Sequence, residues 1–470
     1  MTQSGMLLAM EATEHVAAPV PGWVTALFAV ILVAMVTALA FEEKLHAKKS
    51  LIVGTFAGLC LVTATLLHLL TFGKVRLPDH HEVGLPIYIP AIDWGVITII
   101  LGASLFVEVT SRSGVFTWMA IKLTKKSGGD PWKLLLAYGT LTVLFSAMLN
   151  NVTAMIIIGS LTGVSLKKLR RTDLLLGFLL TEGLLTNVGG LLTLISSVPN
   201  IIVGKTAGID FVTFFMTAAP YVFVCSLATL VMAKRKFGIS SLRDPEERKA
   251  ARELVDSFDE NEGIPSNRFF WFSVASLILF IGCLAGQSEL PWDLDKLEMG
   301  FIALFFAGAV LWAYRHEVDK FYAAVDWDLL AFFAALFVVI HTMEHAQVLA
   351  MMGNGIAEVL ELNSDVASGV LLTSSAIASS VTDNIPLAAV LAQILDSLQT
   401  DPDSPFWWCV VFGANLGGNL TPIGSASTVV AMTIIHRQKL EFSFFDFVKT
   451  AAPFAAMQIV LAVLYVLVWL

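Results

Sequence analysis

Two acidic residues interrupt apolar stretches of this sequence, and both could carry a proton across a membrane. Asp383 lies in "SSVTDNIPLAA" (379–389), and Glu182 lies in "GFLLTEGLLTN" (177–187). An ionisable side chain at the bilayer centre costs ~2.5–3.5 kcal/mol on insertion scales, so a functional role is its default interpretation. We therefore predict that Asp383 and Glu182 are proton-coupling residues. The alternatives are structural: Asp383 could simply cap the helix that follows it, and Glu182 could be a hydrogen-bonded packing residue.

Neutral oxygen and amide groups accompany these acids along the chain. Hard cations such as Na⁺ prefer oxygen ligands, whereas amide and hydroxyl donors would suit an anion equally well. Each polar side chain could instead serve only a hydrogen bond between helices, worth ~0.6 kcal/mol. The glycines in this set serve backbone geometry and close packing. The candidate ion- or substrate-binding residues are Asn150, Asn151, Thr153, Asn187, Gly189, Asp383, Asn384, Asn415, Gly417, Asn419, Thr421 and Ser425. A sodium ion would be held at Asn151, Asn187, Asp383, Asn384 and Asn415.

The composition indicates that a membrane surrounds these residues. The chain has 470 residues, of which 56% are hydrophobic and 14% are charged, and its mean hydropathy is +0.77. Soluble domains carry about 25% charged residues. The apolar blocks are long enough to cross ~30 Å of hydrocarbon. The sequence therefore predicts an all-α polytopic membrane protein with ten full spans, at 22–41, 51–72, 94–110, 173–203, 210–233, 269–286, 298–314, 328–345, 407–436 and 447–470.

Two further apolar stretches, 132–165 and 367–398, are too long for one helix and too short for two spans. Each has a polar break in its middle, so we predict two re-entrant hairpins whose tips stop at mid-membrane depth. Polar, glycine-rich stretches also interrupt the spans 173–203 and 407–436. These two spans are predicted to be discontinuous helices, whose freed backbone groups can coordinate an ion.

The chain also repeats itself. "DW" at Asp93–Trp94 returns 233 residues later, as do Asn150–Asn151 (as Asp383–Asn384) and "TAAP" (217–220). "TNVGGLLTLISS" (186–197) aligns with "ANLGGNLTPIGS" (414–425). Such an offset predicts two inverted repeats with a site at the midplane between them.

The repeats divide the chain into four expected parts. These are a tail (1–21), a first repeat (22–233, with scaffold 22–72 and transport part 94–233), a cytoplasmic linker (234–268) and a second repeat (269–470, with scaffold 269–314 and transport part 328–470).

The distribution of basic residues predicts the orientation. Lys and Arg cluster at 44–49, 122–126, 167–171, 234–236, 315–320 and 437–439, which should all be cytoplasmic. The weakly basic loops 73–92, 204–209, 287–297 and 346–366 should lie outside. No Lys or Arg precedes the first span, so no signal peptide is expected, and a bacterial inner membrane is the predicted location.

The motifs "NNVTAM", "TEGLLTNVGGLLTLISSVPNIIVG", "TDNIPLAAVL" and "GANLGGNLTPIGSASTVVAM" resemble the ion transporter superfamily. The similar branch holds arsenite permeases, the melanosomal P protein, NhaD-type sodium/proton antiporters and citrate-transporter-like permeases. The resemblance implies a scaffold, usually dimeric, and an elevator-like transport domain, and Glu182 matches a glutamate of that family. Two motifs depart from it, because the first hairpin tip reads Asn150–Asn151 where Asp-Asn is usual, and "GDPPN" reads "SSVPN" (196–200).

Two transport functions remain open from the sequence. The first is antiport of protons against Na⁺ or Li⁺, which Asp383, Glu182 and the oxygen ligands favour, since no Lys or Arg lies in the four motifs. The alternative is a permease for arsenite, citrate, a dicarboxylate or sulfate, with a carboxylate held by the half-helix N-termini after Gly190 and Gly418. An enzyme is disfavoured, because the serines near Asp383 have no histidine beside them.

The remaining expectations concern partners. "HTMEH" puts His341 and His345 on one helical face, which a metal could use, but we favour interfacial residues there. No cofactor and no nucleic-acid partner are expected. The partners should be a small ion or small-molecule substrate, the lipid bilayer and a second copy of the chain in a homodimer.

Overall fold

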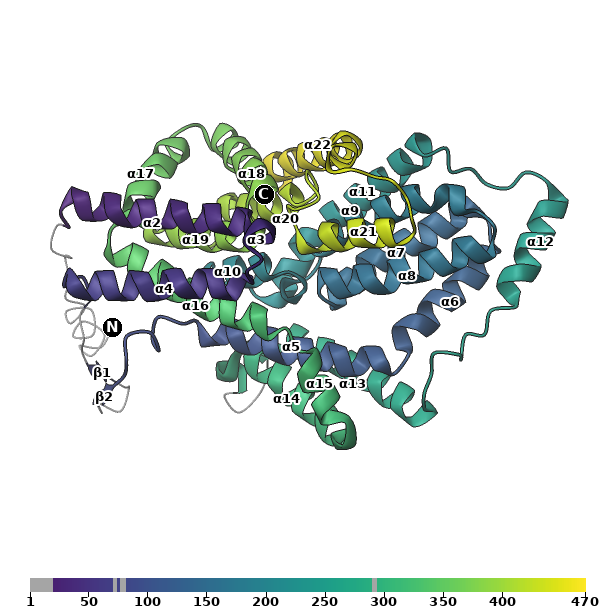
Figure 1. Cartoon of the computed structure of the whole chain (residues 1–470), viewed down its shortest axis with the longest axis horizontal. Coiled ribbons are helices and arrows are strands. Elements are labelled where there is room, and N and C mark those ends of the chain that lie inside the picture. The colour runs from purple at the N-terminus through teal and green to yellow at the C-terminus, as the bar shows by residue number, and fades with distance from the viewer. Residues whose placement is uncertain (1–19, 71–73, 77–81, 290–293) are drawn as a thin grey trace.

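The computed structural model describes residues 20–70, 74–76, 82–289 and 294–470, so the expected tail lies almost wholly outside the described residues. The described chain is nearly all helical (Figure 1). Its strands are β1 (Lys74–Arg76) and β2 (Glu82–Gly84), which pair antiparallel in one small ribbon. The prediction of an all-α membrane protein is confirmed, with this ribbon as a minor addition.

Each expected span is a helix or a pair of half-helices. In the described part of the chain, seven helices are long and apolar enough to cross a bilayer, or eight if α14 and the segment after it, bent by 90°, form one span. The two discontinuous helices bring the count to the ten predicted. The single-helix spans are α2 (Gly22–Ala40), α4 (Lys49–Leu66), α5 (Trp94–Arg112), α11 (Phe211–Lys236), α13 (Asn267–Ala285), α14 (Glu298–Ala313), α16 (Trp327–His345) and α22 (Phe444–Trp469). Shorter helices connect them: α3 (Glu42–Leu45), α6 (Val115–Ser127), α12 (Pro245–Asp256), α15 (Val318–Ala324) and α17 (Val348–Leu360).

The repeated Asp-Trp pair starts a helix in both halves. The Asp93 carboxylate accepts a hydrogen bond from Val96 N at the start of α5, and Asp326 caps α16 through Leu329 N. A side chain that accepts from the first turn satisfies a backbone donor that has no partner within the helix. The sequence repeat is thus expressed as a repeated helix start.

Both predicted hairpins are present. The first joins α7 (Pro131–Met148) to α8 (Asn151–Lys168), and the second joins α18 (Ser364–Val381) to α19 (Asn384–Ser397). Each tip is only two residues long. Asn150 caps α8 and Asp383 caps α19, so the second helix of each hairpin starts in the same way.

Both predicted discontinuous helices are also present, as α9 (Leu175–Gly189) with α10 (Val198–Thr206), and α20 (Pro405–Gly417) with α21 (Ala426–Arg437). The expected reason for their glycines needs one correction. Gly190 and Gly418 have φ values of −61° and −58°, which any residue adopts. The glycines allow close approach instead: a Cβ on Gly189 would lie 2.7 Å from the Val143 backbone.

The contacts within the two halves match as well. In each half, a serine of the first hairpin helix donates to a backbone carbonyl of the broken helix, and a threonine of the break donates back to the hairpin. The sequence repeat is therefore also a repeat of hydrogen bonds, whereas opposite crossing of a bilayer stays a prediction. The matched bonds are Ser146 to Thr186 O with Ser379 to Ala414 O, and Thr193 to Ala147 O with Thr421 to Ser380 O.

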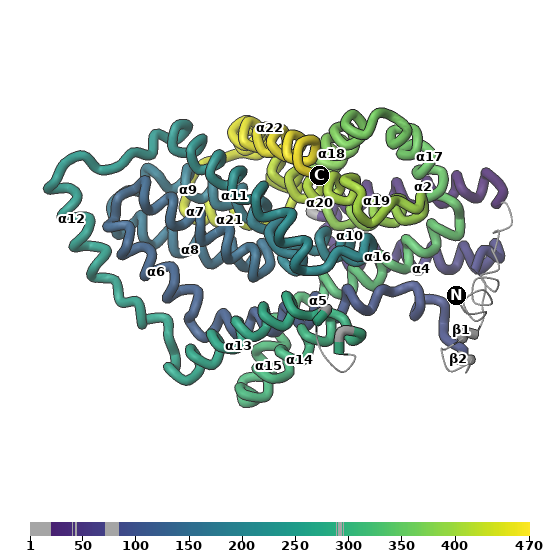
Figure 2. The backbone as a smooth tube through the Cα atoms, turned by 180° about the vertical axis from the view of Figure 1, so that it is seen from behind, coloured from purple at the N-terminus to yellow at the C-terminus, as the bar shows by residue number. Residues whose placement is uncertain are grey.

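The two hairpins lie toward opposite ends of the molecule. Figure 1 shows α7 and α8 toward the right with α21, and α18 and α19 toward the left with α10; Figure 2 shows the same arrangement from behind. The helix α12 of the predicted linker runs along the outer right edge of the bundle. The broken helices thus fill the centre, between the two hairpins.

The helices that surround this centre pair across the repeats. α5 packs closely on α14, and α16 packs closely on α4. A Cβ on Gly102 of α5 would lie 2.5 Å from the Ala303 backbone of α14, so small residues allow this approach. α5 and α16, which the sequence assigns to the transport parts, thus pack most closely on helices that it assigns to the scaffold, and the predicted division into scaffold and transport parts stays a prediction.

Candidate functional site

A buried hydrogen-bond network joins the two broken helices at the centre of the molecule. Its hub is Asn187 at the end of α9, which has no exposed surface. The Asn187 side-chain nitrogen donates to Asn419 Oδ1 and to Ser425 Oγ, both at 2.9 Å. The Asn187 oxygen accepts from Ser427 Oγ at 3.0 Å and from Asn151 Nδ2 at 3.3 Å. One asparagine thus links the first hairpin to both discontinuous helices.

A second hub, Asn415 at the end of α20, occupies the matching position of the other half. Its oxygen accepts from Ser197 Oγ at 2.7 Å, and its nitrogen donates to Asn200 Oδ1 at 2.9 Å. The Asn415–Ser197 pair repeats the Asn187–Ser425 pair with the halves exchanged. The structure therefore brings together predicted residues from both repeats, and the shared centre is made of neutral amides and hydroxyls.

Some members of the network are not among the residues predicted from the sequence. Gln458 of α22 is fully buried and accepts from Asn419 Nδ2 at 2.8 Å. It also donates to Thr229 of α11 at 3.1 Å. The sequence does offer one indication, because Gln458 is a polar residue inside the apolar span 447–470. Asn200 and Ser427 were also missed as candidates, although both lie within the quoted motifs.

Glu182 lies on the same helix as Asn187 but in a different environment. It is fully buried, and its Oε1 accepts from Thr162 Oγ1 of α8 at 2.6 Å. Its Oε2 is buried and has no hydrogen-bond partner among the described residues. A buried carboxylate with an unsatisfied oxygen is costly, so such a group holds a proton or binds a cation. Five residues separate Glu182 from Asn187, which is about 7.5 Å of helix rise.

Asp383 lies outside the network in this structure. Its Oδ1 caps α19 by accepting from Ile385 N at 3.1 Å, and its Oδ2 forms an ion pair with Lys49 Nζ at the start of α4. It also lines an apolar cavity of about 140 Å³ beside α2 and α16. Asp383 therefore caps α19 and at the same time forms an ion pair with Lys49.

The Lys49 contact bears on two expectations. The four motifs themselves contain no Lys or Arg, but Lys49 reaches Asp383 in one of them from 334 residues away. The sequence also predicts Asp383 at mid-membrane depth and Lys49 at the cytoplasmic surface. The ion pair puts both at one depth, so these two predictions cannot both hold in this conformation.

The other predicted residues have separate roles. Among the described residues, Asn150, Thr153 and Asn384 have no side-chain hydrogen bond to the two hubs, and Asn150 serves as the cap of α8. Thr421 donates to Ser380 O and so ties the second break to its hairpin. The predicted binding residues Gly189 and Gly417 provide close packing, as the sequence leads us to expect.

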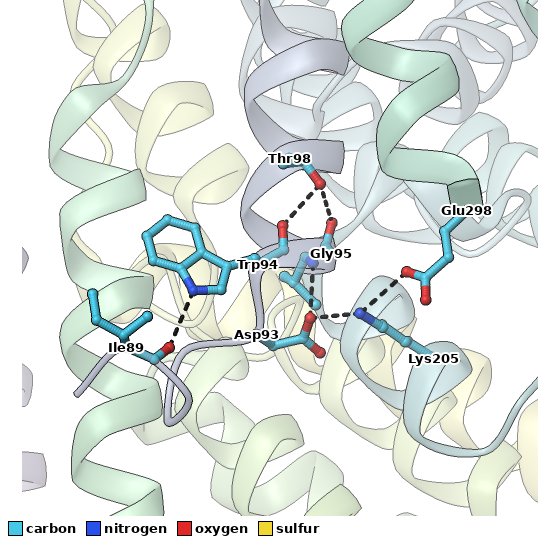
Figure 3. Close-up of polar contacts among 8 residues, drawn as sticks. Ile89, Asp93, Trp94, Gly95, Thr98, Lys205 and Glu298 are labelled. Atoms are coloured by element: carbon cyan, nitrogen blue, oxygen red, sulfur yellow. Dashed lines mark hydrogen bonds and ion pairs between the residues drawn. The ribbon is translucent and has the colours of Figure 1, made fainter. Parts of the chain in front are cut away.

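A second polar region contains the Lys205 cluster, which consists of Asp93, Lys205 and Glu298 (Figure 3). The Lys205 ammonium on α10 lies 2.5 Å from Asp93 Oδ1 and 3.5 Å from Glu298 Oε2. A Cβ on Gly95 would lie 2.0 Å from the Lys205 nitrogen, so only glycine leaves room for this contact. The three charged residues border loops that are all predicted to lie outside, and their contact agrees with that prediction.

Paired helical hairpins, two discontinuous helices and a buried polar centre between them define a membrane transporter. The family model for the citrate transporter (CitMHS) matches residues 5–409, and the chain belongs to this family. The predicted relationship to the ion transporter superfamily is thereby confirmed. With its apolar helices, the chain is a multi-pass membrane protein, and bacterial relatives agree with a plasma-membrane location.

Curated relatives agree with this assignment. The uncharacterized transporter Mb2703 of Mycobacterium bovis is 30% identical over 387 residues, which is 81% of this chain and 86% of that protein. The human P protein is 25% identical over 452 residues, covering 80% of this chain and 54% of the P protein. The chain is therefore similar to bacterial transporters along most of their length and to half of the P protein.

Two solved structures share the fold. The YdaH transporter of Alcanivorax borkumensis superposes with a TM-score of 0.58 at 16% identity, over 90% of this chain and 98% of that chain. MtrF of Neisseria gonorrhoeae gives a TM-score of 0.56 at 15% identity, over 90% and 95%. At these identities the likeness concerns the fold alone.

Proposed function

We propose that this chain is a secondary active transporter that exchanges protons for Na⁺ or Li⁺, with Glu182 as the proton carrier. The observation that carries this proposal is the unsatisfied Oε2 of Glu182, buried on the helix that holds the Asn187 hub. A proton on that oxygen removes the cost of a buried charge, and a cation at the site would remove it equally well. Competition between the two for one carboxylate is what couples them.

The charges around the centre favour a cation over an anion. The two hubs and their partners are neutral, and they offer amide and hydroxyl oxygens as ligands for a hard cation. Glu182 is the acidic group buried beside this neutral centre, and Lys49 is paired with Asp383 and Glu42. An ionised Glu182 would therefore place a negative charge there that one Na⁺ would balance.

The proposed motion is elevator-like. The hairpins and broken helices form the moving part, and α2, α4, α5, α13, α14 and α16 form the scaffold, with a homodimer expected from the resemblance. Two ion pairs cross the boundary between these parts: Lys49–Asp383 and Lys205–Asp93. Since Lys49 occupies the Asp383 carboxylate here, a transported cation would have to displace its ammonium group, or the parts would have to move apart first.

A second candidate is transport of a carboxylate such as citrate. The family description favours it, and so does Lys49, which supplies the basic group that the sequence motifs lack. In this reading the anion would compete with Asp383 for the Lys49 ammonium group.

Flux measurements in proteoliposomes separate these candidates. We expect addition of Na⁺ or Li⁺, but not K⁺, to dissipate an imposed pH gradient that is followed with a pH-sensitive dye. Radiolabelled citrate should not accumulate under the same conditions. Citrate uptake without any Na⁺- or Li⁺-driven proton movement would replace the first candidate by the second, and absence of both signals would contradict both.

A further inference from the structure

The last turn of α16 carries three metal-ligating side chains on one face. His341, Glu344 and His345 stand at positions i, i+3 and i+4, and one ligand atom from each lies within 4.8 Å of the others. In a tetrahedral Zn²⁺ site with bonds of about 2.1 Å, neighbouring ligand atoms lie about 3.4 Å apart, so changes of side-chain rotamer that bring these atoms together by up to about 1.4 Å are needed. The sequence favours interfacial residues here, whereas the structure brings three possible metal ligands close together on this turn.

The hydrogen bonds leave the required lone pairs free. His345 Nδ1 lies 2.9 Å from the His341 carbonyl oxygen, so Nδ1 carries the proton and donates. The His345 Nε2 lone pair is then available to a metal. His341 Nε2 is buried and has no partner among the described residues. A buried imidazole nitrogen without a partner is costly, and a metal bond would satisfy it.

This turn faces a polar cavity that can hold water and further ligands. The cavity has a volume of about 310 Å³ and lies between the start of α5 and the helices α10, α16 and α19. His341 and Glu344 line it together with Asp93, Lys205 and Gln393. Lys205 is already paired with Asp93 and Glu298, so the acids around the cavity outnumber its base. Negative charge of this kind attracts a divalent cation.

We propose that His341, Glu344 and His345 bind a divalent transition metal such as Zn²⁺, with water in the fourth position. Two imidazoles and one carboxylate form a ligand set that suits Zn²⁺ over the hard ions Mg²⁺ and Ca²⁺. The site is separate from the central network and does not depend on the proposed antiport. The cavity is bounded by α10 and α19 on one side and by α5 and α16 on the other. The effect on transport rests on the proposed elevator-like motion: if α10 and α19 move against α5 and α16, a metal bound between them opposes that motion and slows transport.

Metal binding to the purified full-length chain tests the site directly. Titration of Zn²⁺ against a chelating dye should reveal a single equivalent in the unchanged chain and in the control His316→Ala, whose exposed imidazole lies outside the site. His341→Ala and His345→Ala should each weaken binding at least about tenfold. Co²⁺ should give the intense visible absorption of a tetrahedral site in the unchanged chain and lose it in both variants. Thermal unfolding without metal verifies that each variant is folded.

Two results would overturn the site: unchanged Zn²⁺ affinity in the double variant His341→Ala/His345→Ala, or loss of binding in His316→Ala as well. In proteoliposomes, Zn²⁺ should slow transport by the unchanged chain and not by the double variant. Equal inhibition of both, or inhibition of neither, would refute the effect on transport.

Discussion

Glu182 and Asn187 show how strongly the role of a polar residue depends on its partners. Asn187 satisfies both its donors and its acceptor with neighbouring side chains, whereas Glu182 satisfies only one oxygen. The first residue stabilises the junction of the repeats, and the second keeps an oxygen free for a proton or a cation. The two residues should therefore respond differently to substitution.

We expect Glu182→Gln to abolish coupled proton movement while the protein still folds. The amide keeps the shape of the side chain and the contact with Thr162, but it can neither release a proton nor balance a cation. Cation-driven proton flux should fall at least about tenfold, and the thermal unfolding temperature should change little. Glu358→Gln, at an exposed acid on α17, is the matched control and should keep full flux. Normal flux in Glu182→Gln would move the carrier role to Asp383 or elsewhere.

We expect Asn187→Ala to destabilise the protein by about 1–3 kcal/mol, because it leaves buried donors and acceptors of the network without partners. Asn384→Ala serves for comparison, since Asn384 lies next to a hairpin tip, at the start of α19, and makes no side-chain hydrogen bond to the network among the described residues. The measurement is the thermal unfolding temperature in detergent. A shift for Asn187→Ala no larger than that for Asn384→Ala would argue against the hub.

At the scale of elements, the boundaries of the hairpins and of the helix breaks were predictable from the sequence, because the motif at each boundary occurs in both halves of the chain. α9 ends at Gly189 and α20 at Gly417, as the aligned motifs predict. The partners of the site were less predictable. Lys49 and Gln458 reach it from other helices, and a contact across hundreds of residues leaves no local pattern. The pairing of α5 with α14 was missed for the same reason, because packing between helices decides it.

We expect Gly189→Ala and Gly417→Ala to destabilise the protein by about 1–3 kcal/mol, since the added methyl group would overlap with a neighbouring helix. A Cβ on Gly417 would lie 2.2 Å from Ala376 O. Gly282→Ala is the control, because nothing lies within 4 Å of the added atom there. Thermal unfolding of the three variants distinguishes them, and equal unfolding temperatures would show that this packing has no energetic weight.

Asp93 and Lys205 offer a test of relative motion between α5 and α10. With the native cysteines replaced, the double variant Asp93→Cys/Lys205→Cys should be joined by a short reducible thiol cross-linker. Because the proposed motion separates these helices, the cross-link should stop transport, and reduction should restore it. Each single variant treated with the same reagent is the control. Undiminished flux in the cross-linked protein would mean that α5 and α10 stay together throughout the cycle.

In most of the molecule, residues next to loops predicted on the same side of the membrane contact one another, and Lys49, which pairs with Asp383, is an exception. Residues next to loops predicted outside meet in the Lys205 cluster. Residues next to loops predicted inside also meet, as Lys125 lies 3.4 Å from Glu260, and Lys168 lies 4.4 Å from the centre of the Phe258 ring. These contacts agree with the prediction that the first hairpin has an inner base and the second hairpin an outer base. Opposed hairpins are the feature on which the shared central site and the transport cycle depend.

Cysteine accessibility at the bases of the two hairpins tests this claim most directly. On a background without native cysteines, a single cysteine is placed at the exposed position Lys133, in the first turn of α7, or at the exposed position Asp365, at the start of α18. A membrane-impermeant maleimide applied to intact cells should label Asp365→Cys and leave Lys133→Cys unlabelled until the membrane is opened. Labelling of both positions from the same face would contradict the opposed arrangement.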